Sequence, residues 1–410
     1  MSIVLPAPGV VTARPGGPEY WESLTEATRA LETPLGAISL QALAFNADSM
    51  AQRAAGTRIR VASKSIRVRS VIDAVLARPG FGGVLAYTLP EALWLAESVN
   101  DVVVGYPSVD RDALRALATS AELASRVTIM VDSIEHLDLV DAVLPPSRRE
   151  TVRVCLELDA SWNSRLLGHI GTWRSPVHSV DDARALAETI AARPGFALVG
   201  MMAYEGQIAG LVNAPANALR GIAVRWIQGR SAAELAERRA RAVQAVRQVA
   251  ELEFVNGGGT GSLESTSAES SVTEIAAGSG LFGPHLFDHY RHFSPAPAAA
   301  FALSVVRRPD AGKATLLGGG WVASGPAASD RLPLPVWPEG LRMIPREMAG
   351  EVQTPLTGAA AARLRTGDRV WLRHTKAGEL SEHLNGFAIV DGRAVVGEAP
   401  TYRGEGKAFL

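Results

Sequence analysis

Apolar and polar positions alternate along residues 31–294 in a regular order, with short strand-like runs separated by longer helix-like stretches. The strand-like runs are rich in valine, leucine, isoleucine and alanine, and glycine, proline or polar residues bound them. They cover residues 58–63, 83–87, 102–106, 127–131, 152–158, 197–203, 252–256 and 273–277. The helix-like stretches include residues 109–123, 134–144, 180–193 and 231–252. This alternation predicts a (β/α)8 TIM-type barrel, and a doubly wound open sheet is the alternative.

Helix boundaries in this region carry their own signals. Ser231-Ala232-Ala233-Glu234 has the spacing of a capping box, which predicts that the last of these helices begins at Ser231. Pro-Gly pairs at residues 79–80 and 194–195 stop a helix-like stretch just before the next strand-like run.

The pattern changes after Phe293. Residues 294–300 form a Pro/Ala-rich linker, and the chain beyond them has short β-rich runs separated by many turns. These runs cover residues 302–306, 314–318, 369–373, 386–390 and 393–396. We therefore expect a barrel over residues 31–294 and a smaller C-terminal β domain over residues 295–410. The Pro-rich residues 1–30 do not match the barrel pattern, and we expect them to pack with the β domain.

Composition narrows the class of protein. Of the 410 residues 47% are apolar, and 41 basic residues balance 42 acidic ones without a long block of one sign. This balance gives no indication of a nucleic-acid or membrane partner. The single cysteine, Cys155, excludes an intramolecular disulfide and fits a reducing cytoplasm. We find no signal-peptide order at the N-terminus and no uninterrupted apolar run long enough to cross a membrane.

Two features indicate a cofactor. The run Gly257-Gly258-Gly259-Thr260-Gly261 follows a strand-like run, and consecutive glycines allow backbone N–H groups to surround an anion. Lys64 follows another strand-like run and is one of only four lysines (64, 313, 376 and 407) against 37 arginines. An amine forms a Schiff base and a guanidinium does not. Each feature alone also fits a tight turn or a solvated side chain, but together they predict pyridoxal 5'-phosphate.

The barrel geometry brings further residues to the same place. Active sites of such barrels lie at the carboxyl ends of the strands, and phosphate commonly binds after strands 7 and 8. In that numbering Lys64 follows strand 1, residues 159–165 follow strand 5, Tyr204 follows strand 6, the glycine run follows strand 7 and Gly278-Ser279 follows strand 8. All of them are expected on one rim.

At these residues the chain resembles the fold-type III pyridoxal-phosphate enzymes: alanine racemase and, more closely, the D-threonine aldolase and D-serine dehydratase group. The resemblance covers nearly the whole chain and rests on the segments 61–64, 156–159 with Arg165, 202–206, 256–261 and 274–279. The segments 373–380 and 402–407 look most like chains labelled amino acid deaminase/aldolase. The resemblance implies that Lys64 holds the cofactor, that Arg165 lies near its ring and Tyr204 beside it, and that Gly257, Gly258, Gly259, Thr260, Gly278 and Ser279 surround its phosphate. It also implies a homodimer.

Three positions depart from that group. Gln207 stands where the group has a histidine after Tyr-Glu-Gly, and Ser381 stands where a cysteine is expected. The group's two-ligand metal motif reads His374-Thr375-Lys376, which leaves one ligand and one cation. His374 is therefore either a structural histidine or the remaining ligand of a divalent-metal site rebuilt with Glu382 or His383.

We expect a lyase, an aldolase or a dehydratase/deaminase, that acts on a β-hydroxy amino acid of D configuration. Lys64 and Tyr204 would move protons, and His374 and Lys376 would bind the substrate's carboxylate or hydroxyl. The alternatives are an amino acid racemase, which needs a second base, and a non-catalytic pyridoxal-phosphate carrier, which the C-terminal domain disfavours. A structural protein without a cofactor would leave the lysine and the glycine runs unexplained.

Overall fold

The computed structural model describes residues 2–326 and 328–410, and backbone contacts divide the chain into two units. We call Met50–Ser63, Pro79–Ala277 and Phe409–Leu410 the barrel unit, and Met1–Ser49, Lys64–Arg78 and Gly278–Ala408 the sheet unit. Each unit is described by itself. The domain boundaries expected after residues 30 and 294 stay a prediction.

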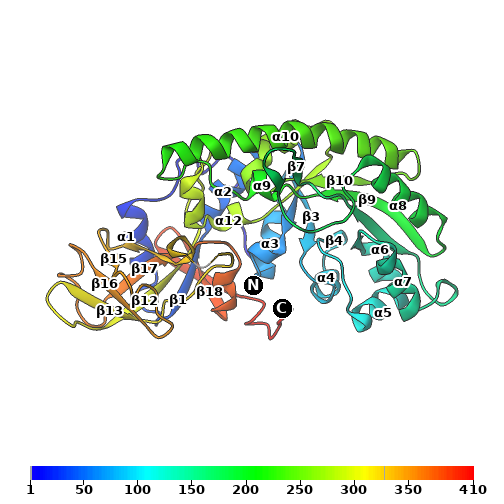
Figure 1. The fold of residues 1–410 in the computed structure, drawn as a ribbon. Helices are drawn as coiled ribbons and strands as arrows, with labels where there is room; N and C mark the ends of the chain where they lie inside the picture. The colour runs from blue at the N-terminus through cyan, green and yellow to red at the C-terminus, as the bar shows by residue number, and fades with distance from the viewer. Residues whose placement is uncertain (1, 327) are drawn as a thin grey trace. The chain divides into compact units, whose positions relative to one another are not determined.

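Eight parallel strands close into a barrel within the barrel unit, which confirms the TIM-type fold class (Figure 1). The order round the barrel is β10-β11-β2-β3-β4-β5-β6-β9. The strands are β2 (Arg58–Ala62), β3 (Phe81–Ala86), β4 (Val102–Val104), β5 (Val127–Val131), β6 (Val152–Glu157), β9 (Phe196–Ala203), β10 (Phe254–Gly257) and β11 (Glu274–Ala277). Their apolar runs lack strict alternation because both faces of a parallel barrel strand are buried.

A buried ion pair crosses the barrel wall between its two neighbouring strands β2 and β11. Arg60 Nε lies 2.6 Å from Glu274 Oε1, and both side chains are almost fully buried. Asn256 donates to the same carboxylate oxygen at 2.9 Å. Because every partner is hydrogen-bonded, the pair avoids the penalty of a buried uncompensated charge and fixes the relative register of β10, β11 and β2.

Helices surround these strands. They are α4 (Leu89–Leu95), α5 (Arg111–Thr119), α6 (Ala121–Arg126), α7 (Ile134–Val143), α8 (Val180–Ala192), α9 (Gly206–Ala209), α10 (Ala218–Arg247) and α11 (Leu263–Ser267). The helix α2 (Leu40–Arg53) begins in the sheet unit and ends in the barrel unit. Although α10 has 30 residues, no helix in the described part of the chain is long and apolar enough to cross a membrane.

The predicted start of the last long helix is wrong. α10 begins at Ala218, where the Asn217 side chain accepts a hydrogen bond from Arg220 N, and Ser231 lies buried in the helix interior. Ser231 Oγ accepts a hydrogen bond from Gln207 Nε2 at 2.9 Å. A serine with a glutamate three residues later thus serves a tertiary contact here rather than a cap.

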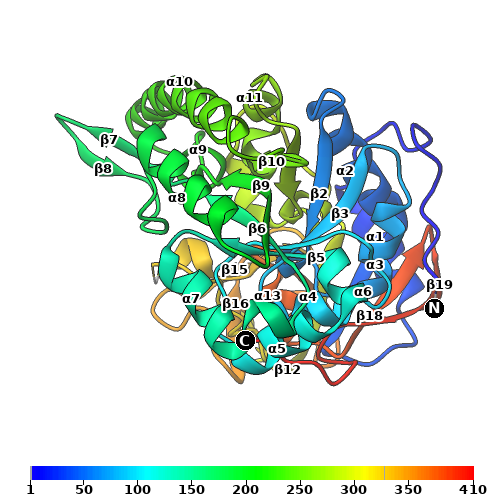
Figure 2. The same cartoon turned by 90° about the vertical axis from the view of Figure 1, so that its right-hand side faces the viewer.

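A two-stranded hairpin follows β6, formed by β7 (Trp162–Ser164) and β8 (Gly168–Ile170). Figure 2 shows it extending outward beside α8 and α10. The ring of Trp162 contacts Trp226 of α10, with centroids 6.2 Å apart. The hairpin and α10 therefore form one continuous surface.

The sheet unit contains a nine-stranded sheet, which confirms the expected β-rich C-terminal region. Its path is β15-β16-β13-β12-β1-β18-β19, with β17 pairing with β12 and β14. The strands are β1 (Leu35–Ser39), β12 (Ala299–Arg307), β13 (Lys313–Leu317), β14 (Leu334–Trp337), β15 (Arg342–Met343), β16 (Gln353–Thr357), β17 (Arg369–Arg373), β18 (Gly386–Asp391) and β19 (Ala394–Pro400). The short helices here are α1 (Pro18–Ala27), α3 (Arg69–Leu76), α12 (Ser279–Phe282) and α13 (Glu379–Glu382).

The N-terminal segment contributes to the core of this unit. β1 pairs antiparallel with β12 and parallel with β18, so a strand from near the N-terminus lies between two C-terminal ones. Trp21 and Leu24 of α1 pack with Trp371 of β17 in one buried cluster. The Trp371 indole also donates to Thr25 Oγ1 at 2.9 Å. These contacts explain why the first residues lack the barrel pattern.

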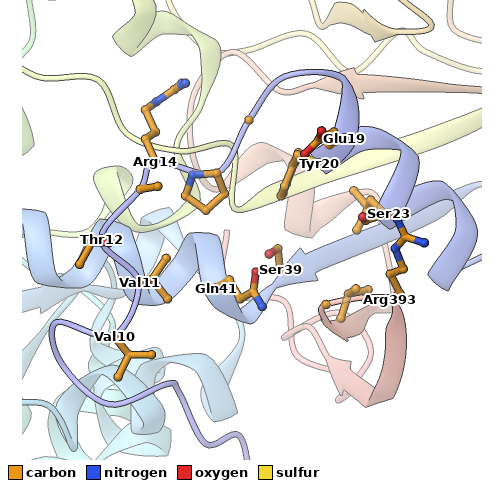
Figure 3. Close-up of a pocket in the computed structure, with 16 residues that line it drawn as sticks. Val10, Val11, Thr12, Arg14, Glu19, Tyr20, Ser23, Ser39, Gln41 and Arg393 are labelled. Atoms are coloured by element: carbon orange, nitrogen blue, oxygen red, sulfur yellow. The ribbon is translucent and has the colours of Figure 1, made fainter.

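A cavity of about 670 Å³ lies under the segment 10–16 in the sheet unit (Figure 3). Arg14 and Tyr20 fix this segment, because they donate to the carbonyls of Pro295 and Pro297. Ser39 and Gln41 lie on the opposite wall. None of the site residues expected from the sequence lines this cavity.

Candidate active site

The expected cofactor residues follow four neighbouring strands of the barrel. Lys64 lies in the 3₁₀ turn Ser63–Ser65 directly after β2, and Tyr204 directly follows β9. The glycine run begins at the last residue of β10, and Gly278 directly follows β11. Since β9, β10, β11 and β2 are consecutive and parallel, their carboxyl ends form one stretch of the rim.

The glycine run is a close-packed loop. Gly258 has φ +73°, and a Cβ there would lie 2.8 Å from Ile275 Cγ2 and 3.0 Å from Thr266 Oγ1. A Cβ on Gly259 would lie 3.0 Å from Ala209 Cβ and 3.5 Å from the Tyr204 ring. Any side chain at these positions would therefore displace the loop, whereas an ordinary surface turn would accept one.

Two amides of this loop already have partners. Gly258 N donates to Glu205 Oε2 at 2.9 Å, and Gly259 N donates to Ser262 Oγ at 3.2 Å. The sequence suggested that the glycine amides would all face an anion, and the structure shows that these two hold the loop in shape. Thr260 and Gly261 follow in the 3₁₀ turn Thr260–Ser262, where the carbonyl of Thr260 accepts a hydrogen bond from Arg53 Nη2 at 2.8 Å.

Glu205 is the centre of the network behind this loop. Besides Gly258 N, it accepts hydrogen bonds from Arg239 Nη2 at 2.9 Å and Thr266 Oγ1 at 2.6 Å, and it is buried. Arg239 is fully buried on α10 and also approaches Glu269 at 3.2 Å. Burial raises the pKa of Glu269 to about 7, with Arg239 opposing that shift and Glu205 adding to it. Sequence reasoning quoted Glu205 only as part of a motif and missed Arg239, although an arginine on the inner face of a helix is a usable signal.

Tyr204 lies between this loop and a cation. The guanidinium carbon of Arg174 is 4.7 Å from the centroid of the Tyr204 ring and 5.4 Å from that of Tyr106. Burial raises the pKa of the Tyr204 phenol, Arg174 opposes the shift, and Glu205 adds to it. The phenol is therefore protonated at neutral pH.

Arg165, the cation expected near the cofactor ring, is exposed in the turn between β7 and β8. In contrast to Arg165, the acidic residue Glu157 at the end of β6 is buried. Burial raises the pKa of its carboxyl to about 7, Arg174 opposes that shift, and Asp132 and Asp159 reinforce it. Within the barrel unit, the arginine brought close to Tyr204 is thus Arg174 and not Arg165.

Gln207 ties the loop after β9 to its surroundings. Its amide nitrogen donates to Ala160 O at 2.6 Å and to Ser231 Oγ at 2.9 Å. Gln207 therefore has a structural role, because it links the loop after β6 to α10.

In the sheet unit, His374 directly follows β17 and is buried. The Phe282 ring contacts it edge-on, with centroids 6.4 Å apart. Burial lowers the pKa of His374 to about 3, and the positive charge of Arg373 and the neighbouring His285 lower it further, while the Ala299 backbone opposes them. His374 is therefore a neutral imidazole across the physiological range.

Lys376 lies within reach of the charge on Lys64. Burial lowers the pKa of Lys376, Arg331 and Lys64 lower it further, and Glu379 and Asp330 act in the opposite direction. The backbone of Gly378 lies against the carbonyl of Lys64, so close that a Cβ on Gly378 would collide with it. The sheet unit thus brings together two of the expected catalytic residues, Lys64 and Lys376.

The residues considered for a metal site have other contacts. Glu382 forms an ion pair with Arg67, and the His383 ring stacks on Trp321 with centroids 4.9 Å apart. Ser381 Oγ donates to Ile66 O at 2.7 Å. Across residues 2–326 and 328–410, no group of three or more histidine, cysteine or acidic side chains has the arrangement of a metal site.

The family model for the alanine racemase N-terminal domain matches residues 38–285. The chain belongs to this family. Members of the family depend on pyridoxal phosphate. No curated protein matches the chain.

Solved structures agree on the fold. A D-threonine aldolase from Filomicrobium marinum superposes with a TM-score of 0.74 at 22% identity, covering 91% of this chain and 96% of its own. A D-threo-3-hydroxyaspartate dehydratase from Delftia sp. HT23 gives 0.69 at 20%, covering 90% and 97%. An alanine racemase from E. faecalis gives 0.55 at 16%, covering 85% and 92%. At these identities the likeness shows the fold and leaves the reaction to be argued from the site.

Proposed function

We propose that the protein is a pyridoxal-phosphate-dependent lyase that acts on a β-hydroxy amino acid of D configuration, by aldol cleavage or by dehydration. The observation that supports this most is the pairing of Lys64 after β2 with the constrained glycine loop after β10 on one barrel. The similarity in fold to an aldolase and a dehydratase of such substrates supports the same class.

The residues present fit the cofactor. Lys64 offers an amine, and the loop at Gly258 and Gly259 has a floor that a single Cβ would disrupt. Thr260 and Gly261 after β10, and Gly278 and Ser279 after β11, would contact the phosphate, because the loops after adjacent parallel strands lie on one rim of a barrel. Once bound, pyridoxal phosphate supplies an electron sink for the bond that breaks at Cα or Cβ.

The chain's own groups divide the proton transfers. Lys64 Nζ would hold the cofactor and then move a proton, and the protonated Tyr204 hydroxyl would donate a hydrogen bond or a proton. Lys376 would supply a positive charge to the substrate's carboxylate or leaving hydroxyl, and neutral His374 would position it. Arg174, which lies over the Tyr204 ring, would provide the cation near the cofactor ring that the resemblance assigned to Arg165.

A racemase is the second candidate, because alanine racemases share the fold. Racemisation needs one base on each face of Cα. The raised pKa of Tyr204 disfavours that side chain as the second base. Product analysis separates the candidates: an aldolase yields an aldehyde and a smaller amino acid, a dehydratase yields a keto acid and ammonia, and a racemase yields only the enantiomer.

We also propose that the protein is a homodimer in a reducing cytoplasm, and that the extension of the barrel rim forms its interface. Arg239 of α10 contacts Ala203 O at the end of β9, so the first twenty residues of α10 reach about 30 Å beyond that rim. These residues, the hairpin and the segments 171–176 and 210–217 expose apolar side chains: Leu166, Leu167, Trp173, Leu211, Leu219, Ile222 and Trp226.

The area of this extension fits a second copy of the chain. Its exposed apolar surface is on the order of 700 Å², close to the ~800 Å² that each partner of a stable interface contributes. Residues 162–176 and 210–230 hold five arginines and no acidic residue. Because the whole chain is nearly neutral, its other residues carry a net negative charge that complements this positive surface. Trp226→Glu should halve the mass in light scattering, and Leu317→Glu on β13 should not. A wild-type monomer that binds anionic vesicles would contradict the dimer.

The function is tested with Lys64→Ala and the control Lys313→Ala, which changes an exposed lysine on β13. Purified wild type and control should show the visible absorbance of a lysine-bound cofactor, which borohydride fixes, and should consume D-β-hydroxy amino acids. Lys64→Ala should lose both properties and keep its circular dichroism spectrum. Borohydride-fixed cofactor in Lys64→Ala would overturn the assignment.

A further inference from the structure

Three cations meet in the sheet unit, and one of them, Arg331, has no part in the function described so far. A Cβ placed on Gly325 would lie 3.1 Å from Arg331 Nε and 3.7 Å from Lys376 Nζ, so the two side chains border the same point. The charges of Arg331 and Lys64 both act on Lys376. The cluster is therefore centred on Lys376, with Arg331 beside it and the charge of Lys64 acting on it.

The guanidinium of Arg331 lacks acceptors. Its Nε and Nη1 atoms are buried and have no hydrogen-bond partner among the described residues. Among residues 2–326 and 328–410, the acidic oxygen that pairs with it is Asp330 Oδ2, 3.9 Å from Nη1, and that carboxylate is largely exposed. Buried guanidinium donors without acceptors are costly, because they have given up water and gained nothing in exchange.

The position of Arg331 is fixed by its neighbour in the chain. The carbonyl of Leu332 accepts hydrogen bonds from His285 Nε2 at 2.9 Å and from Thr375 Oγ1 at 2.8 Å. Thr375 directly precedes Lys376, so these bonds fasten the backbone beside Arg331 to the backbone beside Lys376. The two cations are held together by the fold rather than by a mobile loop.

Negative charge in this region does not balance the cluster. Glu379 Oε1 accepts a hydrogen bond from Ser324 N at 3.0 Å, and its other oxygen is buried without a partner. Two carboxylates, those of Glu379 and Asp330, thus act on Lys376 against the charges of Arg331 and Lys64, and Asp330 is largely exposed. Such a surplus, with donors already desolvated, is the arrangement of a site that binds an anion.

We propose that Arg331 and Lys376 together bind two carboxylates of one substrate, so that the preferred substrate is a dicarboxylic β-hydroxy amino acid. This inference rests on the proposed lyase function and specifies its substrate. With Lys64 occupied by the cofactor, two cations remain. An amino acid with a neutral side chain offers one carboxylate and leaves the donors of the other cation unpaired. A second carboxylate satisfies them, and the planar guanidinium suits it.

The experiment compares a dicarboxylic with a neutral β-hydroxy amino acid of the same stereochemistry. Wild type should prefer the dicarboxylic one by about tenfold to hundredfold in kcat/KM. Arg331→Met should remove that preference mainly through KM while changing turnover of the neutral substrate less than about threefold. Arg331→Lys should restore part of it, and Arg342→Met, which changes an exposed arginine on β15, should leave it intact. Equal kcat/KM values in wild type, or an equal loss for both substrates in Arg331→Met, would overturn the proposal.

A binding measurement separates this inference from the lyase function. Malate has two carboxylates and no amine, so its binding by calorimetry needs neither turnover nor a bond to the cofactor. Malate binding that Arg331→Met abolishes supports the site even if no β-hydroxy amino acid is consumed, in which case the lyase function alone fails. A protein that consumes neutral β-hydroxy amino acids and does not bind malate keeps the lyase function and loses this inference. Tighter binding of inorganic phosphate than of malate would also overturn it.

Discussion

Replacing His374 tests how completely the fold has desolvated this side chain. In the folded protein its pKa falls from 6.5 to about 3, chiefly through burial and then through Arg373 and His285. Between those two values the unfolded chain binds a proton that the folded chain does not. The free energy of unfolding therefore falls as the pH drops from about 6.5 toward 3, and this contribution is fully present above 6.5.

The size of the effect follows from the shift. Each pH unit inside the window costs about 1.4 kcal/mol, so between pH 7 and pH 4 His374 should remove about 3 kcal/mol of stability. His374→Phe carries no proton in either state and keeps a ring against Phe282. The substitution also changes the packing energy, but that change does not depend on pH. The test therefore compares the slopes of the free energy of unfolding against pH.

The assay is urea unfolding of wild type and His374→Phe at four pH values from 4 to 7.5, followed by tryptophan fluorescence. We expect the variant to gain about 3 kcal/mol relative to wild type on going from neutral to acid pH. His289→Phe, which changes an exposed histidine of the same unit, is the control for removing an imidazole. Parallel curves for wild type and His374→Phe would refute the reasoning and show that water or an unrecognised partner solvates the ring.

Three further predictions concern the cofactor site. Gly258→Val should lower cofactor affinity at least about tenfold, because a β-branched residue disfavours φ +73° and collides with Ile275. Gly229→Ala, with open space at its Cβ, should leave the affinity unchanged. Equal affinities of the two variants in a fluorescence titration would show that the loop is a turn without a part in cofactor binding. Arg174→Met should raise the pKa of Tyr204 further and weaken cofactor binding, and Arg165→Met should do neither, as followed by ultraviolet titration of the phenol. Chelator treatment should leave activity intact because Lys376 supplies the local positive charge, and one divalent ion per chain in elemental analysis, with activity lost on its removal, would contradict this.

The barrel could be predicted from the sequence because its strands are buried on both faces. Such strands appear as continuous apolar runs, and all eight expected runs overlap a barrel strand. In the sheet unit, the strands β14 and β16 were not predicted from the sequence, for a physical reason. β14 and β16 contain Pro335 and Pro355, and a proline within a short run argues against a strand because it removes a ladder donor.

β1 escaped for a different reason. Its five residues run directly into α2, so a strand and a helix share one apolar stretch and no turn residue separates them. Its partners β12 and β18 are more than 250 residues away in the chain. No local pattern encodes such a pairing, which is decided by the burial of Trp21, Leu24 and Trp371 in a common core.

The candidate site was predictable to the extent that its residues follow strands. The positions of Lys64, Tyr204 and the glycine run at strand ends could be predicted because a barrel strand determines where its next residue lies. The network behind them was not, since Glu205, Arg239 and Thr266 come from three separate elements. Side-chain hydrogen bonds of this kind depend on distances that only the packed structure supplies.

Arg165 illustrates the limit of motif reasoning most clearly. The sequence places it six residues after Asp159, and a motif assumes that such a spacing keeps its geometry. Here Asp159 accepts hydrogen bonds from Ser161 N and His178 Nδ1, which fixes both ends of the segment between them. Between those points the chain folds into the β7–β8 hairpin and carries Arg165 outward to its turn. The segment that follows β8 then brings Arg174 to the face of the Tyr204 ring. The positive charge near this tyrosine therefore comes from a residue that the spacing of the motif does not identify.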